Sequence, residues 1–169
     1  MQYAKDSFFR ALQARLAVVN PARTIVLDGV ARPAILVAEN EPFPPHKLFF
    51  QCFYIHWLGA PAVRSFTRTA LPRYELLAQI EYFLHGTPTL QRPFADRGRR
   101  MAEMDRELLS ILHPGVTEKM DHSVSPPASL GSFLHWRWAP DFRTVADGDG
   151  SVLRRLALVN VSFYPEALL

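Results

Sequence analysis

The chain has 169 residues, of which 49% are hydrophobic and 21% are charged. This length suits one ordinary domain, and this balance predicts a packed core instead of a disordered chain. A single cysteine excludes a disulfide within the chain and a zinc cluster built from several thiolates. The net charge of +3 could serve to keep the protein in solution or to bind nucleic acid, so the charge alone does not decide between these roles.

The longest apolar stretch runs from Leu48 to Val63 and is interrupted by Gln51 and His56. It is shorter than the roughly 20 residues that a membrane-spanning helix needs. Charged side chains also interrupt the N-terminal segment, so it lacks the apolar core of a signal peptide. We therefore expect a soluble protein without a membrane partner, which stays in the compartment where it is made.

The N-terminal segment predicts an amphipathic helix from Asp6 to Val19. Its apolar side chains recur at the spacing of helical turns, at Phe8, Leu12, Leu16 and Val19. Asp6 or Ser7 is expected to cap the first turn. Asn20-Pro21 ends the helix, because a residue before proline is pushed out of the helical region.

A β-hairpin is predicted next. Residues 24–27 form a short β-branched run, and Asp28-Gly29 is a pair suited to a tight turn. The return strand is expected at residues 34–38, directly after Pro33.

Residues 48–58 are rich in aromatic and β-branched side chains and predict a strand, with a helix as the competing interpretation. Both faces of this strand are largely apolar. It is therefore expected to be central and covered on both sides, or to have one face buried by another protein chain.

Two consecutive helices are predicted in the middle of the chain. The first begins near Pro72, a residue that the first turn tolerates, and ends at Gly86, which suits a left-handed cap. Its inward stripe is Leu76, Ile80 and Phe83, widened by Leu77 and Leu84. The second helix spans residues 96–112 and ends before Pro114-Gly115.

After a polar linker at 121–129, side chains alternate over residues 133–138 and predict a half-buried strand. Residues 156–164 alternate in the same way and supply its partner. The connection at 140–151 is expected to be a protruding, mobile loop. The order α-β-β-β-α-α-β-β predicts a single α+β domain over residues 1–169, with a mixed or antiparallel sheet, helices packed on it and a long C-terminal β-hairpin.

The sequence contains no catalytic signature, so we expect no enzyme, metal or cofactor. Cys52 and His56 share a strand face with Tyr54, but four residues along a strand are separated by about 13 Å. The simpler interpretation is that Cys52 is buried in the core and that His56 is a structural residue with its hydrogen bonds made. His113 with Asp121-His122 lacks the helical spacing of two metal-binding histidines.

The segment Asp147–Gly150 is similar to the start of a calcium-binding loop, in which carboxylates alternate around a tight turn. The residues that follow do not supply the remaining oxygen ligands. A plain turn is the simpler interpretation.

The densest basic cluster is Arg97, Arg99 and Arg100, with Arg92 upstream. Such a cluster suits a phosphate backbone. Glu103 lies four residues after Arg99, and Glu107 lies four residues after Glu103, so these carboxylates neutralise part of the positive charge within the helix. A solvated helix face is therefore the simpler interpretation.

Two parts of the chain carry a resemblance to a known family. The opening part comprises Phe8–Leu16, Arg23–Gly29 and Pro33–Glu39, and the closing part comprises Gly131–Trp138 and Leu156–Phe163. Both resemble the tail terminator proteins of long-tailed bacteriophages. The resemblance covers most of the chain as an order of elements.

The resemblance implies a structural virion protein, made in the host cytoplasm and located at the head–tail junction. It implies a ring of about six copies that caps the tail tube and joins it to the head. Its partners would be further copies of the chain, the major tail tube protein and the head–tail connector proteins. Nucleic acid would be present only as DNA passing through the lumen.

We expect contacts between subunits, or with the tube, where aromatic and arginine side chains gather. The candidate residues are Trp57, Phe66, Arg99, Arg100, Phe142, Arg143, Asp147 and Asp149. Phe142→Asp, or deletion of Asp147–Gly150, is expected to dissociate the ring.

Other interpretations stay open. One is a different head–tail connector or neck protein. Another is a small enzyme or ligand-binding domain, active as a monomer or dimer, with the face of Cys52, Tyr54 and His56 as its pocket. Nucleic-acid binding through residues 92–100 would show an affinity that falls steeply with salt.

Overall fold

The structure is a computed structural model that describes residues 1–39, 49–63, 72–85, 93–146 and 152–164, with the backbone alone at 60–63, 93–96 and 139–146. The elements are α1 (Gln2–Val19), β1 (Thr24–Leu27), β2 (Val30–Pro33), β3 (Ile35–Val37), β4 (Phe53–Val63), β5 (Tyr74–His85), α2 (Pro93–Ile111), β6 (Gly115–Asp121), β7 (Ala128–Ala146) and β8 (Val152–Phe163).

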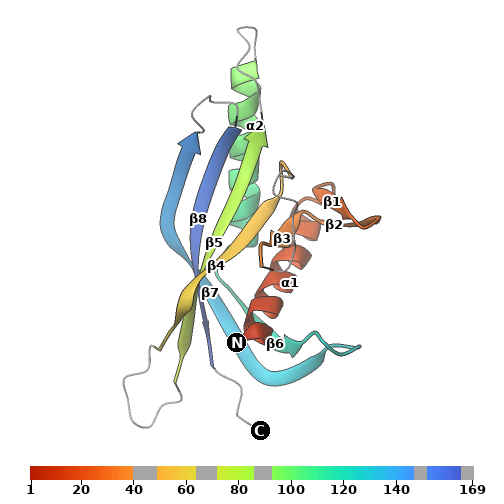
Figure 1. The fold of residues 1–169 in the computed structure, drawn as a ribbon, viewed down its shortest axis with the longest axis vertical. Coiled ribbons are helices and arrows are strands. Elements are labelled where there is room, and N and C mark those ends of the chain that lie inside the picture. Colours follow the sequence, from red (N-terminus) through yellow and green to blue (C-terminus); the bar gives the residue numbers. More distant parts are fainter. Residues whose placement is uncertain (40–48, 64–71, 86–92, 147–151, 165–169) are drawn as a thin grey trace.

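The strands of the described residues form a six-stranded sheet in the order β3-β4-β5-β8-β7-β6 and a separate two-stranded hairpin, β1-β2 (Figure 1). β3 pairs with β4 in parallel, and the other neighbours pair antiparallel. This arrangement confirms the predicted α+β class, the mixed sheet and the C-terminal pairing of β7 with β8.

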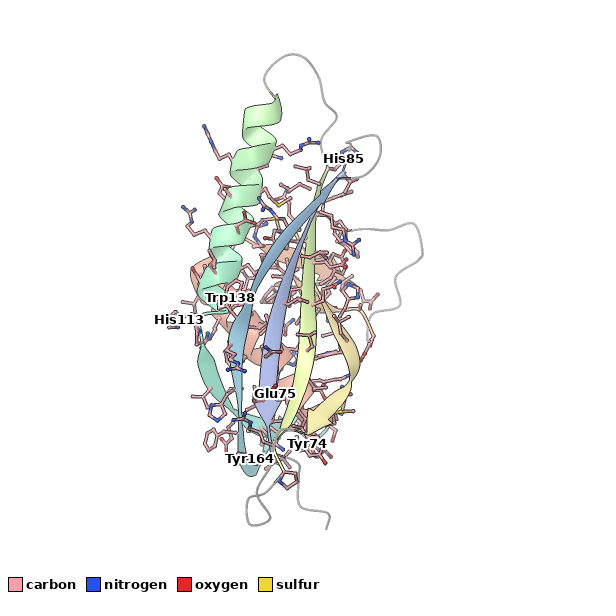
Figure 2. The ribbon with its side chains drawn as sticks, turned by 90° about the vertical axis from the view of Figure 1, so that its left-hand side faces the viewer. Tyr74, Glu75, His85, His113, Trp138 and Tyr164 are labelled. Atoms are coloured by element: carbon pink, nitrogen blue, oxygen red, sulfur yellow. The ribbon has the colours of Figure 1, made fainter. Side chains whose placement is uncertain are left out.

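The main core lies between the two helices and one face of the sheet. Phe8 of α1 is fully buried, and its ring packs edge to face against two tryptophans. The ring centroids are 5.7 Å apart for Trp57 of β4 and 5.6 Å apart for Trp136 of β7. α2 is held by a hydrogen bond from the Tyr82 hydroxyl of β5 to Asp105. The helices therefore cover one face of the sheet, and Figure 2 looks onto the opposite face, with α1 behind the strands.

The segment from Pro72 to Gly86 is not a helix, as its spacing predicted, but contains the strand β5. β5 pairs with β4 on one side and with β8 on the other. Its core-facing side chains are Leu76, Ala78, Ile80, Tyr82 and Leu84. A spacing of four residues is about one helical turn and also two strand repeats, so Leu76 and Ile80 fit both structures. The helix predicted at 96–112 is confirmed as α2.

The predicted hairpin forms, but its return strand is β2 and not residues 34–38. Asp28 and Gly29 supply the turn with φ values of 50° and 80°. Ala34 marks the change from one sheet to the other: its N–H donates to the Arg23 carbonyl, and its carbonyl accepts from the N–H of Phe53. β3 then joins the large sheet beside β4.

The strand predicted at 48–58 is confirmed only from Phe53 onward, as β4, because residues 49–52 form a turn before it. β4 lies second from one edge of the sheet. Its start is covered on both faces. One face packs on the main core, and the other contributes Tyr54 to a second cluster, whose buried members are Ile25, Ala34, Leu36, Cys52, Tyr54 and Phe83. The apolar character of both strand faces therefore has its explanation within one chain at this end.

Strand β6 was not predicted from the sequence, because most of its side chains are polar. Its sixth residue, Met120, donates its backbone N–H to the Ser7 hydroxyl of α1 at 2.9 Å. The helix α1 starts at Gln2, and Met1 occupies its N-cap without a side-chain hydrogen bond. Asp6 and Ser7 thus lie inside the helix, so the prediction that one of them caps its first turn is wrong.

Candidate interaction surface on the open face of the sheet

The face of the sheet that points away from the helices is named the open face. Strand alternation and pairing place these described side chains on it: His56, Leu58, Glu75, Leu77, Gln79, Glu81, Val116, Glu118, Phe133, His135, Arg137, Arg154, Leu156, Leu158, Asn160 and Ser162. An antiparallel face in water is ordinarily polar. The open face instead combines ordered charges with large exposed apolar side chains.

Glu81 lies at the centre of the first group of charges. It is only 6% exposed although it lies on the open face. Arg154 of β8 pairs with its carboxylate, His56 Nε2 of β4 lies 3.6 Å from Oε2, and Gln79 donates to Oε1 at 2.6 Å. Burial acts to raise the pKa of Glu81, but the hydrogen bonds and charges of His56 and Arg154 outweigh it and lower the pKa. The carboxylate is thus a fixed negative charge at neutral pH.

Glu75 lies at the centre of the second group, six residues earlier on β5. Oε1 of its carboxylate accepts from Ser162 Oγ at 3.4 Å and lies 3.5 Å from Arg73 and 3.9 Å from Arg137. Oppositely charged side chains on neighbouring strands stabilise their pairing by a few tenths of a kcal/mol to about 1 kcal/mol. The two groups of charges therefore give the open face a defined arrangement of positive and negative side chains.

Large apolar side chains are exposed at one end of the open face. Val116 is 54% exposed, Phe133 52% and Tyr164 42%. Leu134 pairs with Phe163, so Phe133 and Tyr164 follow side by side at the end of the β7–β8 ladder. Tyr164 lies near the lower end of the sheet in Figure 2. These three residues are named the sheet-side patch, and exposed aromatic rings of this kind are enriched at protein interfaces.

The candidate interface residues predicted from the sequence are not brought together on this face. Trp57 is 9% exposed and its ring packs against Phe8 of α1, so this ring belongs to the core, and a position of Trp57 near an interface stays a prediction. Arg99 and Arg100 are exposed on α2. Phe66, Asp147 and Asp149 lie outside the described residues.

The backbone of Phe142 and Arg143 lies in β7 and pairs with Ala157 and Leu156 of β8. Their side chains lie outside the described part of the chain. The segment predicted as a loop at 140–151 is thus strand up to Ala146, and residues 147–151 lie outside the described residues.

The alternative pocket of Cys52, Tyr54 and His56 does not form as one site. Cys52 and Tyr54 are buried in the second cluster, whereas His56 belongs to the charges around Glu81. The Tyr54 hydroxyl accepts from the N–H of Phe49 at 2.7 Å and donates to its carbonyl at 3.1 Å, and burial raises the pKa of Tyr54 to about 12. A hollow of about 580 Å³ is lined by Cys52 but by neither of the other two residues.

Glu107 of α2 was predicted to neutralise part of the positive charge of the arginines on its own helix. It instead pairs with Arg23, and it accepts from the Asn20 side chain at 2.7 Å. This contact ties the segment between α1 and β1 to α2. Arg100 and Arg23 both line a small hollow of about 240 Å³.

A comparison with protein-family models and with curated proteins finds no match for this chain. Within the described residues, no group of three or more His, Cys, Asp and Glu side chains is placed to hold a metal ion. Neither α1 nor α2, the helices in the described ranges, is long and apolar enough to cross a membrane.

Glu75 and Glu81 were not singled out from the sequence, because the segment that contains them was predicted to be a helix. A signal for the correct assignment was present. Polar Glu75, Gln79 and Glu81 alternate with the apolar residues of β5, apart from Leu77, and such alternation favours a half-buried strand.

Proposed function

We propose that this chain is a ring-forming structural protein of a phage tail, a tail terminator that caps the tail tube and joins it to the head connector. The observation that supports ring formation best is the open face, where the exposed side chains of Val116, Phe133 and Tyr164 lie on the same face as ordered charges. A second protein surface that covers this face would bury the rings and meet charges already held in place.

The assignment to a tail is supported by the elements that carry the family resemblance. Phe8–Leu16 lies in α1, and Arg23–Gly29 includes β1 and its turn. Gly131–Trp138 and Leu156–Phe163 lie on the paired strands β7 and β8. The matched segments therefore lie in helix and strand elements near the two ends of the chain, whereas the order between them differs from the expected one, because β5 replaces the first central helix.

The test compares Phe133→Asp with Val30→Asp as a matched control. Both residues are exposed hydrophobics, but Val30 lies on the β1-β2 hairpin and not on the open face. Circular dichroism first establishes that both variants fold. By sedimentation, Phe133→Asp is expected to be monomeric, whereas Val30→Asp keeps the mass of the wild-type ring. Loss of the ring in both variants, or in neither, would contradict the assignment of the open face.

Tail function is tested separately with purified tail tubes and electron microscopy. A terminator is expected to decorate one end of each tube. Rings that bind only isolated head connectors would favour a neck protein, and a monomer that binds neither would contradict the proposal.

A further inference from the structure

A second exposed apolar surface lies on the helix side of the molecule. The last turns of α1 and α2 enclose a shallow hollow of about 540 Å³, lined by Ala14, Arg15, Val18, Val19, Ser110 and His113. Val18 is 82% exposed and Val19 44%. Leu109, which is 48% exposed, precedes Ser110 on α2. Val18, Val19 and Leu109 are named the helix-side patch.

We infer that the helix-side patch of one copy receives the sheet-side patch of the next copy, in a head-to-tail contact. This inference rests on the proposed function, because it assigns the second surface that a ring needs. The occupant of the hollow is thus another copy of this chain, and the residues that enter it are Phe133 and Tyr164.

The placement of the two patches favours this contact over a symmetric dimer. The helix-side patch is formed by the two helices, whereas the sheet-side patch is formed by β6, β7 and the residue after β8, so the two patches are different surfaces of the chain. A two-fold contact uses the same surface on both partners and would leave the other patch in water. A head-to-tail contact covers both patches and, when the rotation closes, produces a ring.

The shapes and charges of the two patches are also complementary. The sheet-side patch presents two rings, whereas the helix-side patch borders a hollow. Glu118 is paired directly opposite Phe133 in the sheet. On the helix side, exposed Arg10 lies one turn before Ala14, and exposed Arg106 lies one turn before Ser110. Charges of opposite sign across an interface set its register and exclude other partners.

The test is disulfide crosslinking of Val18→Cys and Phe133→Cys, with copper phenanthroline and air as the oxidant and a non-reducing gel as the readout. The double variant is expected to give a ladder of covalent oligomers that ends at the size of the ring. Each single variant is expected to stay uncrosslinked, and an equimolar mixture of the two is expected to give crosslinked dimers only.

The chain offers suitable controls for this experiment. The native Cys52 is 1% exposed and does not compete with the new thiols. Val30→Cys combined with Phe133→Cys pairs the sheet-side patch with an exposed valine outside the helix-side patch, and it should give no ladder. A disulfide within one chain keeps the mass of a monomer, so it cannot produce the expected bands.

The outcomes separate this inference from the proposed function. Rings without a ladder would overturn the head-to-tail contact and leave ring formation intact. Covalent dimers from either single variant would show a two-fold contact and overturn the inference as well. A chain that stays monomeric by light scattering would overturn both.

Discussion

Glu81→Gln tests whether the charges on the open face are fixed by the fold. The substitution keeps the shape of the side chain and removes the negative charge that Arg154 and His56 face. Breaking a fully buried ion pair costs about 3–5 kcal/mol, whereas an exposed pair contributes about 0–1 kcal/mol. The Glu81 side chain is 8% exposed, but those of Arg154 and His56 are 35% and 36% exposed, so solvent screens the interaction. We therefore expect a loss of about 1–2 kcal/mol in the free energy of unfolding, between these two limits.

The assay is urea denaturation of the wild type and the variant at several pH values. The pKa of Glu81 in the folded protein is lowered from its usual value of 4.5. The contribution of the carboxylate is therefore fully present above this value and is lost as the pH falls through the lower pKa of the folded state. The difference between the two proteins should be constant near pH 7 and shrink on acidification below 4.5.

Glu39→Gln is the matched control, because Glu39 forms an ion pair with Lys5 while its own side chain is 48% exposed. This variant is expected to lose less than about 0.5 kcal/mol. Equal stability of Glu81→Gln and the wild type at pH 7, or a difference that grows on acidification, would refute the reasoning.

Two further predictions concern the core. Phe8→Ala removes the ring between Trp57 and Trp136 and should lower the free energy of unfolding by about 3–5 kcal/mol in a urea titration, and a loss below 1 kcal/mol would contradict the packing. Gly115→Ala would place a Cβ atom 2.5 Å from Trp136 Cζ2 and against Arg15 Nη2, so we expect a loss of about 1–3 kcal/mol in thermal unfolding. An unchanged midpoint for this variant would show that the ring and the guanidinium move aside without cost.

The elements with their own clear pattern were predictable from the sequence. α1 has an apolar stripe and a proline after its end, and the turn at Asp28-Gly29 has the residues that positive φ angles require. β5 was mistaken for a helix because Leu76 and Ile80 satisfy both periods, and its two strand neighbours decide between them.

β6 was not predictable in the same way, because its position depends on residues far away in the sequence. Lys119 is fully buried, and its ammonium group donates to the Tyr164 carbonyl at 2.6 Å. Lysine is almost never fully buried without a partner, so the sequence predicts an exposed side chain at this position. The partner that permits burial lies far away in the sequence and cannot be identified from the pattern of the strand. The pairing of β6 with β7 and its contact with Ser7 hold this polar segment in place.

The candidate surface was only partly within reach of the sequence. Exposed aromatic and arginine residues were expected at an interface, and the structure does expose Phe133 and Arg137 on one face. The residues chosen beforehand included Trp57, whose ring is taken by the core. Which large side chains are buried depends on how α1 crosses the sheet, and a pattern within one strand does not contain that information.

The mass of the purified chain in solution tests the central claim most directly. Light scattering over a wide range of concentrations is expected to give about six times the 19.2 kDa of one subunit. A mass of 19.2 kDa at every concentration would contradict the claim that the open face joins copies of this chain into a ring.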